Sequence, residues 1–78
     1  MLDLIYIEWI DSAGSESTWD SDTDLEPAKI QSVGIFVKET KRAVTIGQSR
    51  DVNRPPLWDN LLVIPHNAIR RRRKMRLP

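Results

Sequence analysis

Cysteine is absent from the 78-residue sequence, and so is any long run of apolar residues. Without cysteine, the chain has no disulfide, no thiolate zinc site and no cysteine nucleophile. The apolar stretch at residues 4–7 ends at Glu8, whereas a membrane-spanning helix needs about 20 apolar residues. Asp3 stands where a signal peptide would carry its basic residues. We therefore expect a cytoplasmic protein that contacts no membrane.

Motifs of catalysis and cofactor binding are also missing. The sequence has no Walker loop, no GxGxxG and no Ser-His-Asp ordering, and its one histidine, His66, lies in a predicted turn. The three aspartates within residues 20–24 have the spacing that begins a calcium loop, but that loop needs Gly at its sixth position and Glu at its twelfth. Leu25 and Gln31 stand there instead. We expect no enzyme, no metal site and no cofactor.

The length permits one small domain, residues 1–78. Folding at this size hides roughly 60% of the unfolded chain's surface, so we expect stability to depend on oligomerisation or on a very regular sheet. Charge is divided along the chain: residues 1–27 hold eight acids and no base, and residues 28–78 hold all twelve bases and three acids. The two halves either neutralise each other, within one molecule or head-to-tail between copies, or form a basic patch for an anionic partner.

Alternating apolar and polar residues predict five strands. Residues 2–10 alternate, with one face made of Ile5, Ile7 and Trp9. Residues 32–38 and 43–48 form a predicted hairpin. A short apolar run at residues 61–64 is the fourth predicted strand, and Ile69 starts a last strand that runs to Met75. In the hairpin, the residues predicted to face the core are Val33, Ile35, Val37, Val44 and Ile46.

Three connections decide the predicted architecture. An acidic loop at residues 11–28 contains a short helical turn after the first strand, and a proline-rich loop covers residues 49–60. A single 3₁₀ turn at residues 66–68 precedes the last strand. Gly34 and Gly47 indicate strong bending. The fold class is therefore predicted as mainly β, a small five-stranded barrel of the SH3-like or Sm-like kind.

Several of these motifs also carry a resemblance to a known group of proteins. They are EWIDS at residues 8–12, Trp19, SVGIFVKE at residues 32–39, and VIP at residues 63–65 with Ile69. Together they resemble small uncharacterised proteins encoded by bacteriophages and prophages, over most of the chain. The basic run after Ile69 departs from that pattern. The resemblance implies a non-enzymatic accessory protein that acts stoichiometrically in the host cytoplasm, as a self-assembled oligomer or as an inhibitor of a host component.

The basic segment at residues 70–78 is the strongest candidate for a binding site. Its cations are Arg70, Arg71, Arg72, Arg73, Lys74 and Arg76. On a strand they alternate between two faces, and a small barrel cannot bury arginine on one of them. Either the strand ends within residues 69–71 and a tail projects, or the cations pair with the acidic first segment. Arginine suits planar contacts with carboxylate and phosphate, so nucleic acid, a nucleotide and an acidic protein are all candidate partners.

Trp19 and Trp58 lie in predicted loops, where tryptophan needs an explanation. Each ring is a lid over an open end of the barrel, a stacking platform for bases or an interface anchor. We favour the lid for one ring and an interface for the other. Three functions stay open at this point: a protein-binding homo-oligomer or host-protein binder, a nucleic-acid or nucleotide binder, and a small virion or assembly component.

Overall fold

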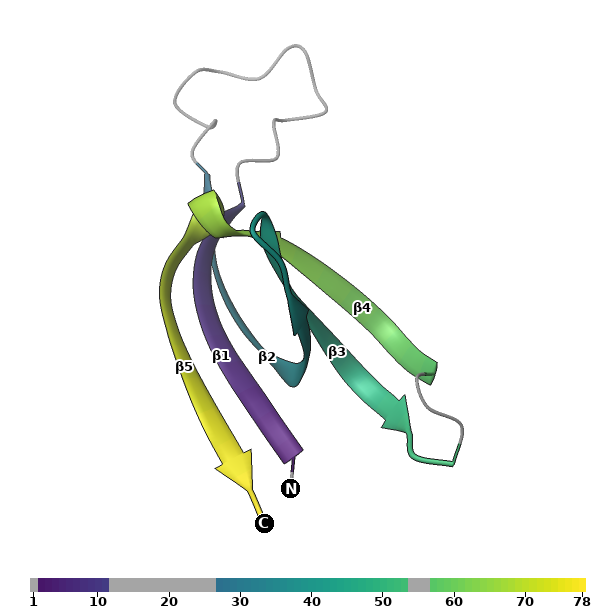
Figure 1. The fold of residues 1–78 in the computed structure, drawn as a ribbon. Helices are drawn as coiled ribbons and strands as arrows, with labels where there is room; N and C mark the ends of the chain where they lie inside the picture. Colours follow the sequence, from purple (N-terminus) through teal and green to yellow (C-terminus); the bar gives the residue numbers. More distant parts are fainter. Residues whose placement is uncertain (1, 12–26, 54–56) are drawn as a thin grey trace.

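A single antiparallel sheet makes up the computed structural model, which describes residues 2–11, 27–53 and 57–78 (Figure 1). The elements are β1 (Leu2–Asp11), β2 (Ala28–Glu39), β3 (Ala43–Asp51), β4 (Leu57–Pro65), the 3₁₀ turn η2 (His66–Ala68) and β5 (Ile69–Leu77). The strand order across the sheet is β4-β3-β2-β1-β5. The predictions of a mainly β fold, five strands and a 3₁₀ turn before the last strand are confirmed.

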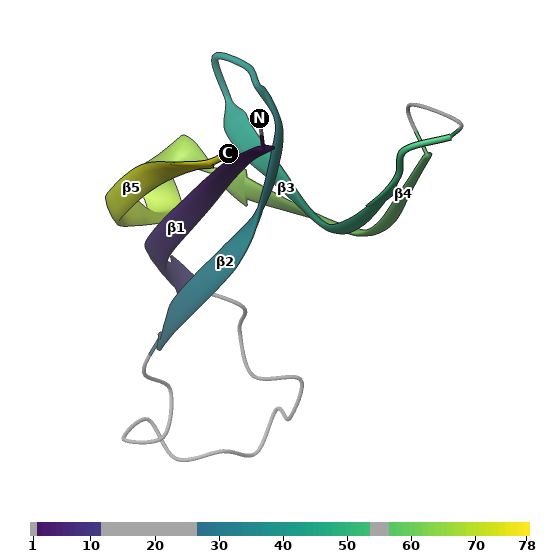
Figure 2. The same cartoon turned by 90° about the horizontal axis from the view of Figure 1, so that it is seen from below.

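The sheet is open, because β4 and β5 stand at the two ends of the strand order. Figure 2 shows these two strands at opposite ends of the curved sheet. Although η2 joins them directly, they do not pair in the described part of the chain, so the predicted barrel is not closed. Each edge strand therefore turns part of its backbone N–H and C=O groups away from the sheet.

The core lies on one face of the sheet and is small. Its buried side chains are Ile5, Ile7, Val44, Ile46 and Ile64, with Trp9, Phe36 and Ile69 packed against them. Residues from β1 and β4 meet in this cluster although two strands separate them, so the sheet curls around its core. The predicted inward face of β1 and the predicted burial of both β3 residues are confirmed.

The predicted inward face of β2 is wrong. Val33 is 61% exposed, and it pairs with Tyr6, on the face opposite the core. Gly34 and Phe36 hold the inward positions instead: Phe36 packs against the core cluster, and a Cβ built on Gly34 would lie 3.0 Å from the Cβ of Ile46. Both faces of β2 carry apolar residues, and the missing glycine side chain is what lets β2 approach β3 closely.

Two predicted loops are shorter than expected, and the predicted tail is part of the sheet. β3 continues to Asp51 and β4 begins at Leu57, so strand pairing takes up most of the predicted proline-rich loop at residues 49–60. β2 begins at Ala28, and the predicted helical turn before it falls on residues outside the described ranges, apart from Pro27 and Ala28. The basic segment belongs to β5 up to Leu77 and pairs with β1, so it is no projecting tail.

Candidate binding surfaces at the two sheet edges

The register between β5 and β1 divides the basic residues between two faces. Arg72 and Lys74 lie opposite the core residues Ile7 and Ile5, and Arg76 lies opposite Asp3. Directly opposed residues of an antiparallel pair share a face, so these three cations are on the core side. Arg71 and Arg73 lie opposite Glu8 and Tyr6, on the outer side.

Each cation on the core side has a partner within the molecule. Arg76 Nε lies 3.0 Å from Asp3 Oδ1, and Arg72 Nη1 lies 3.0 Å from Glu39 Oε2. Lys74 Nζ stands 4.3 Å from the centroid of the Phe36 ring, within range of a cation–π contact. Long side chains of this kind can cover apolar surface with their stems, and the charged ends of Arg72 and Arg76 reach acids. This answers how a small sheet tolerates arginine on its core side.

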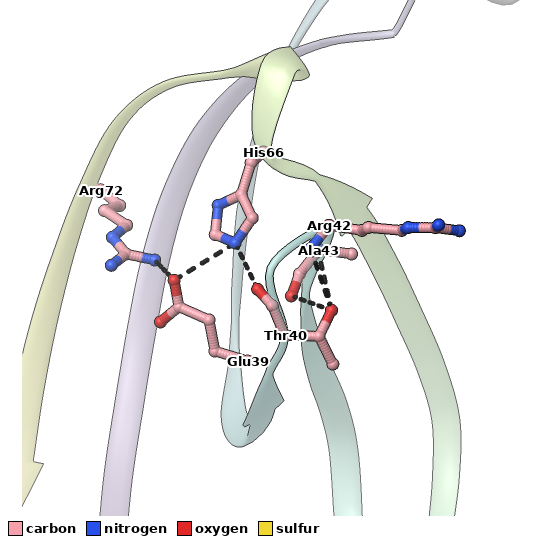
Figure 3. A network of polar contacts seen from close by, with 6 residues as sticks. All are labelled: Glu39, Thr40, Arg42, Ala43, His66 and Arg72. Carbon is pink, nitrogen blue, oxygen red and sulfur yellow. Dashed lines mark hydrogen bonds and ion pairs between the residues drawn. The ribbon is translucent and has the colours of Figure 1, made fainter.

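Glu39 is the centre of the polar network in Figure 3, which ties three parts of the fold together. Its carboxylate binds Arg72 of β5 and lies 3.3 Å from His66 Nε2 of η2. That nitrogen is also 2.8 Å from the carbonyl oxygen of Thr40, and because both partners are acceptors, it is the donor. The hydrogen bond from Arg72 is the main cause that lowers the pKa of Glu39, and nearby positive charges add to it.

The backbone and the ring of His66 both join η2 to the connection between β2 and β3. Its backbone N–H donates to the carbonyl of Arg42 at 2.9 Å, and its ring reaches Thr40 in the same β2–β3 connection. The network holds η2, and with it the path from β4 to β5, over the end of the hairpin. Sequence reasoning missed Glu39, although an acid standing in the basic half of the chain is the signal that could have found it.

The outer side of β5 is different, because its cations form no ion pair with the residues that the structure describes. Within the described residues, Arg71 and Arg73 make no ion pair and no side-chain hydrogen bond. Beside them, Tyr6 donates its hydroxyl proton to Glu8 and accepts a hydrogen bond from Gln31 at 3.0 Å. The bond to Glu8 is the main cause that raises the pKa of Tyr6. Glu8 is therefore engaged by its neighbour, and two guanidinium groups are left facing solvent.

The other edge, β4, is apolar and exposed. Four of its large side chains are open to solvent by about a third or more: Leu57 (52%), Leu61 (54%), Leu62 (36%) and Val63 (60%). Asp59 is its single charged residue. An edge strand that combines unpaired backbone with exposed apolar side chains readily pairs with another strand.

Trp58 lies in β4 rather than in a loop. Its ring is half-buried over Gly47 of β3, where a Cβ would come within 2.6 Å of the ring atom Cε3. The guanidinium of Arg50 stands 5.8 Å from the ring centroid. Trp58 thus covers part of its own sheet beside the exposed leucines. Trp19 lies outside the described residues.

A metal site and a membrane-spanning helix have requirements that the described part of the chain does not meet. Across residues 2–11, 27–53 and 57–78, no three His, Asp or Glu side chains lie close enough together to hold a metal ion. None of the helical structure in these ranges is long and apolar enough to cross a membrane. The aspartates of residues 20–24 lie outside the described ranges.

Comparison with known proteins adds no relative to this picture. No protein-family model, no curated protein and no solved structure matches the chain. The likeness to phage-encoded proteins and to SH3-like or Sm-like barrels stays an expectation from the sequence. The two edges of the sheet, one apolar and one basic, are the features from which a function is inferred.

Proposed function

We propose that this protein is a non-enzymatic binding module that self-associates through its β4 edge. The observation that carries the proposal is the exposed apolar row of β4 beside unpaired edge backbone. Pairing with another strand satisfies those backbone groups and removes the leucine side chains from water, and both effects stabilise the assembly. A chain of this size also has little core of its own, so association adds the apolar burial that it lacks.

The partner that fits β4 best is β4 of a second copy. An antiparallel β4–β4 pair around a two-fold axis sets apolar residues against apolar residues, which is the favourable cross-strand combination. Pairing β4 with β5 of the next copy instead sets the leucines of β4 against a strand with six basic residues and no acid. We therefore place the dimer contact on β4, and β5 stays available.

Light scattering after size exclusion, at micromolar concentration, tests the proposal with a matched pair of variants. Val63 on β4 and Val33 on the central strand β2 are 60% and 61% exposed. We expect the parent and Val33→Lys to run as dimers and Val63→Lys to run as a monomer. A monomeric parent in low salt contradicts self-association, and a larger ring contradicts the two-fold arrangement.

A second candidate function, nucleic-acid binding, rests on the outward cations Arg71 and Arg73. These two guanidinium groups are exposed and have no ion pair within the described residues. Phosphate groups accept bidentate hydrogen bonds from arginine. Two phosphate contacts give only weak, strongly salt-dependent affinity, so this function ranks below self-association.

The resemblance to phage-encoded proteins, an expectation from the sequence, suggests a biological role for such a module. A small module that self-associates suits a stoichiometric role, either as an inhibitor bound to a host protein or as a minor assembly component. Copurification of the tagged dimer with host proteins, with Val63→Lys as the monomeric control, separates a partner of the dimer from one that binds the single chain.

A further inference from the structure

The β5 edge carries an inference that is independent of self-association. We infer that β5 accepts an acidic, extended segment of a partner protein, which adds to the sheet as a sixth strand. The order of side chains on β5 also specifies the order of residues in that segment.

The backbone of β5 is prepared for strand addition. The strand pairs with β1 in one register from Leu2–Leu77 to Glu8–Arg71, and a register shift separates that stretch from the pair Trp9–Ile69. Its other side has no neighbouring strand in the described part of the chain. Arg70 is turned back toward η2 by a hydrogen bond to the carbonyl of Asn67 at 2.8 Å. The receptive stretch is therefore residues 71–77, and added main-chain hydrogen bonds supply the affinity.

The outer face of this stretch has a definite order of side chains. Arg71 and Arg73 come first, with no ion pair among the described residues, and Met75 and Leu77 follow, 42% and 46% exposed. Opposed side chains in neighbouring strands interact favourably when charges are opposite or when both are apolar. In an antiparallel addition, the incoming segment thus reads apolar-x-apolar-x-acid-x-acid from its N-terminus.

The inner face of β5 adds little to this recognition, because its cations already have contacts within the molecule. Arg72 and Arg76 bind Glu39 and Asp3, and Lys74 stands over Phe36. The x positions of the incoming segment face these occupied side chains, so small polar residues suit them. Specificity therefore comes from the outer face.

Two other occupants fit the edge less well. β4 of another copy carries one acid, Asp59, with leucines at the alternate positions on either side, so an antiparallel addition cannot place acids against both Arg71 and Arg73. A nucleic acid finds two uncommitted cations on the outer face and leaves the edge N–H and C=O groups unpaired. An extended acidic peptide satisfies both the backbone and the charges.

Fluorescence anisotropy with three labelled peptides tests the inference on the full chain. The first, TVTVTETET, has the specified order; the second, TETETVTVT, has the same composition in reverse order; the third, TVTVTKTKT, reverses the charge. We expect the parent protein to bind the first peptide about tenfold more tightly than the second, from two cross-strand charge pairs. Equal binding of the first two peptides, or no binding of the first, overturns the inference.

The double variant Arg71→Glu/Arg73→Glu supplies the matched test on the protein side. Since neither arginine forms an ion pair within the described ranges, we expect the fold to survive, the affinity for TVTVTETET to fall about tenfold and the affinity for TVTVTKTKT to rise. This exchange of preference cannot come from a damaged fold. If the double variant melts like the parent but binds neither TVTVTETET nor TVTVTKTKT, the added strand is not recognised through charge pairs, and the inference is wrong. Tighter binding of single-stranded DNA than of the first peptide assigns the edge to nucleic acid instead.

The variant Val63→Lys separates this inference from the proposed self-association. We expect it to be monomeric and to bind TVTVTETET as tightly as the parent does, because β4 lies at the other end of the sheet. A parent that is monomeric and still binds the peptide removes only the self-association. A peptide that binds the parent but not Val63→Lys places its site on β4 and overturns the inference for β5.

Discussion

The two edge strands of this sheet both leave backbone groups unpaired by a neighbouring strand, but their side chains are of opposite character. β4 and β5 each have nine residues and one neighbouring strand. β4 has one charged residue, whereas β5 has six basic residues and no acid. Charged side chains on an edge strand discourage indiscriminate pairing. The charges of β5 thus disfavour pairing with apolar strands and with other copies of β5, whereas β4 has no such charges. We therefore propose a separate kind of partner for each edge.

Shortening a buried side chain of an edge strand is expected to have the largest effect on stability. Ile64 of β4 is fully buried, whereas Met75 of β5 is 42% exposed. Ile64→Ala should cost about 2–4 kcal/mol of unfolding free energy, the usual loss for a buried aliphatic residue. In a domain with only about 5 kcal/mol available, that nearly unfolds the chain. Met75→Ala should change stability by less than about 0.5 kcal/mol. Urea denaturation at fixed protein concentration measures both.

If the two variants lose equal stability, the sheet buries its two edges alike, and the comparison between β4 and β5 fails. Fixed concentration matters, because a dimer's apparent stability depends on how much protein is present. Repeating the series in the Val63→Lys background removes that dependence.

A tight contact under β4 gives the next largest expected effect. A Cβ at Gly47 would lie 2.6 Å from a ring atom of Trp58, so Gly47→Ala forces the indole away from β3. Overpacking of this kind costs about 1–3 kcal/mol. Adding Trp58→Leu should recover part of that loss, because the smaller side chain leaves room for the new methyl group. Thermal melting of the two single variants and the double variant shows the coupling; simple additivity would mean that the ring does not rest on Gly47.

How far the sequence predicts this fold depends on whether a strand has one apolar face or two. β1 alternates cleanly, and its inward residues Ile5 and Ile7 were predicted correctly. β2 is apolar on both faces, and the pattern favoured the side that includes Val33, because Gly34 contributes no hydrophobicity to its own side. The decisive fact there is a close approach between two backbones, which is a property of the packed sheet.

Strand ends and charge partners were harder to predict for a related reason. Asp59 and Asn60 were interpreted as loop residues, yet they lie within β4, where Asn60 takes a φ of 53°, a left-handed conformation that asparagine tolerates better than most residues. The pairing of Arg72 with Glu39 joins residues 33 positions apart. It depends on the register of β5 against β1 and on the curl of the sheet, and neither follows from local sequence.

Acid should weaken the network that ties β5 to the hairpin. Because the pKa of Glu39 is lowered from its ordinary value of 4.5, its ionised form stabilises the folded chain above that pH. The stabilisation is lost as the pH falls through the lower pKa of the folded state. The parent should therefore melt slightly higher than Glu39→Gln at neutral pH, and the difference should disappear well below pH 4.5. If the parent still melts higher than Glu39→Gln in strong acid, the substitution acts through side-chain packing and not through the charge of Glu39.

The smallest expected effect concerns the two faces of β5 and decides the second candidate function. If Arg71 and Arg73 serve phosphate groups, each contributes about −0.9 to the slope of log affinity against log salt on duplex DNA, or about −1.8 together. Arg71→Ala/Arg73→Ala should then abolish most of the slope and melt like the parent. Arg72→Ala/Arg76→Ala should keep the slope and lose stability instead, because Glu39 and Asp3 lose their partners. Filter binding across a salt series and melting of both variants measure the two effects. A parent slope near −3.6 would require about four contacts, so cations other than Arg71 and Arg73 would have to take part. No binding by the parent at low salt would remove nucleic acid as a partner and leave the outward arginines to a protein.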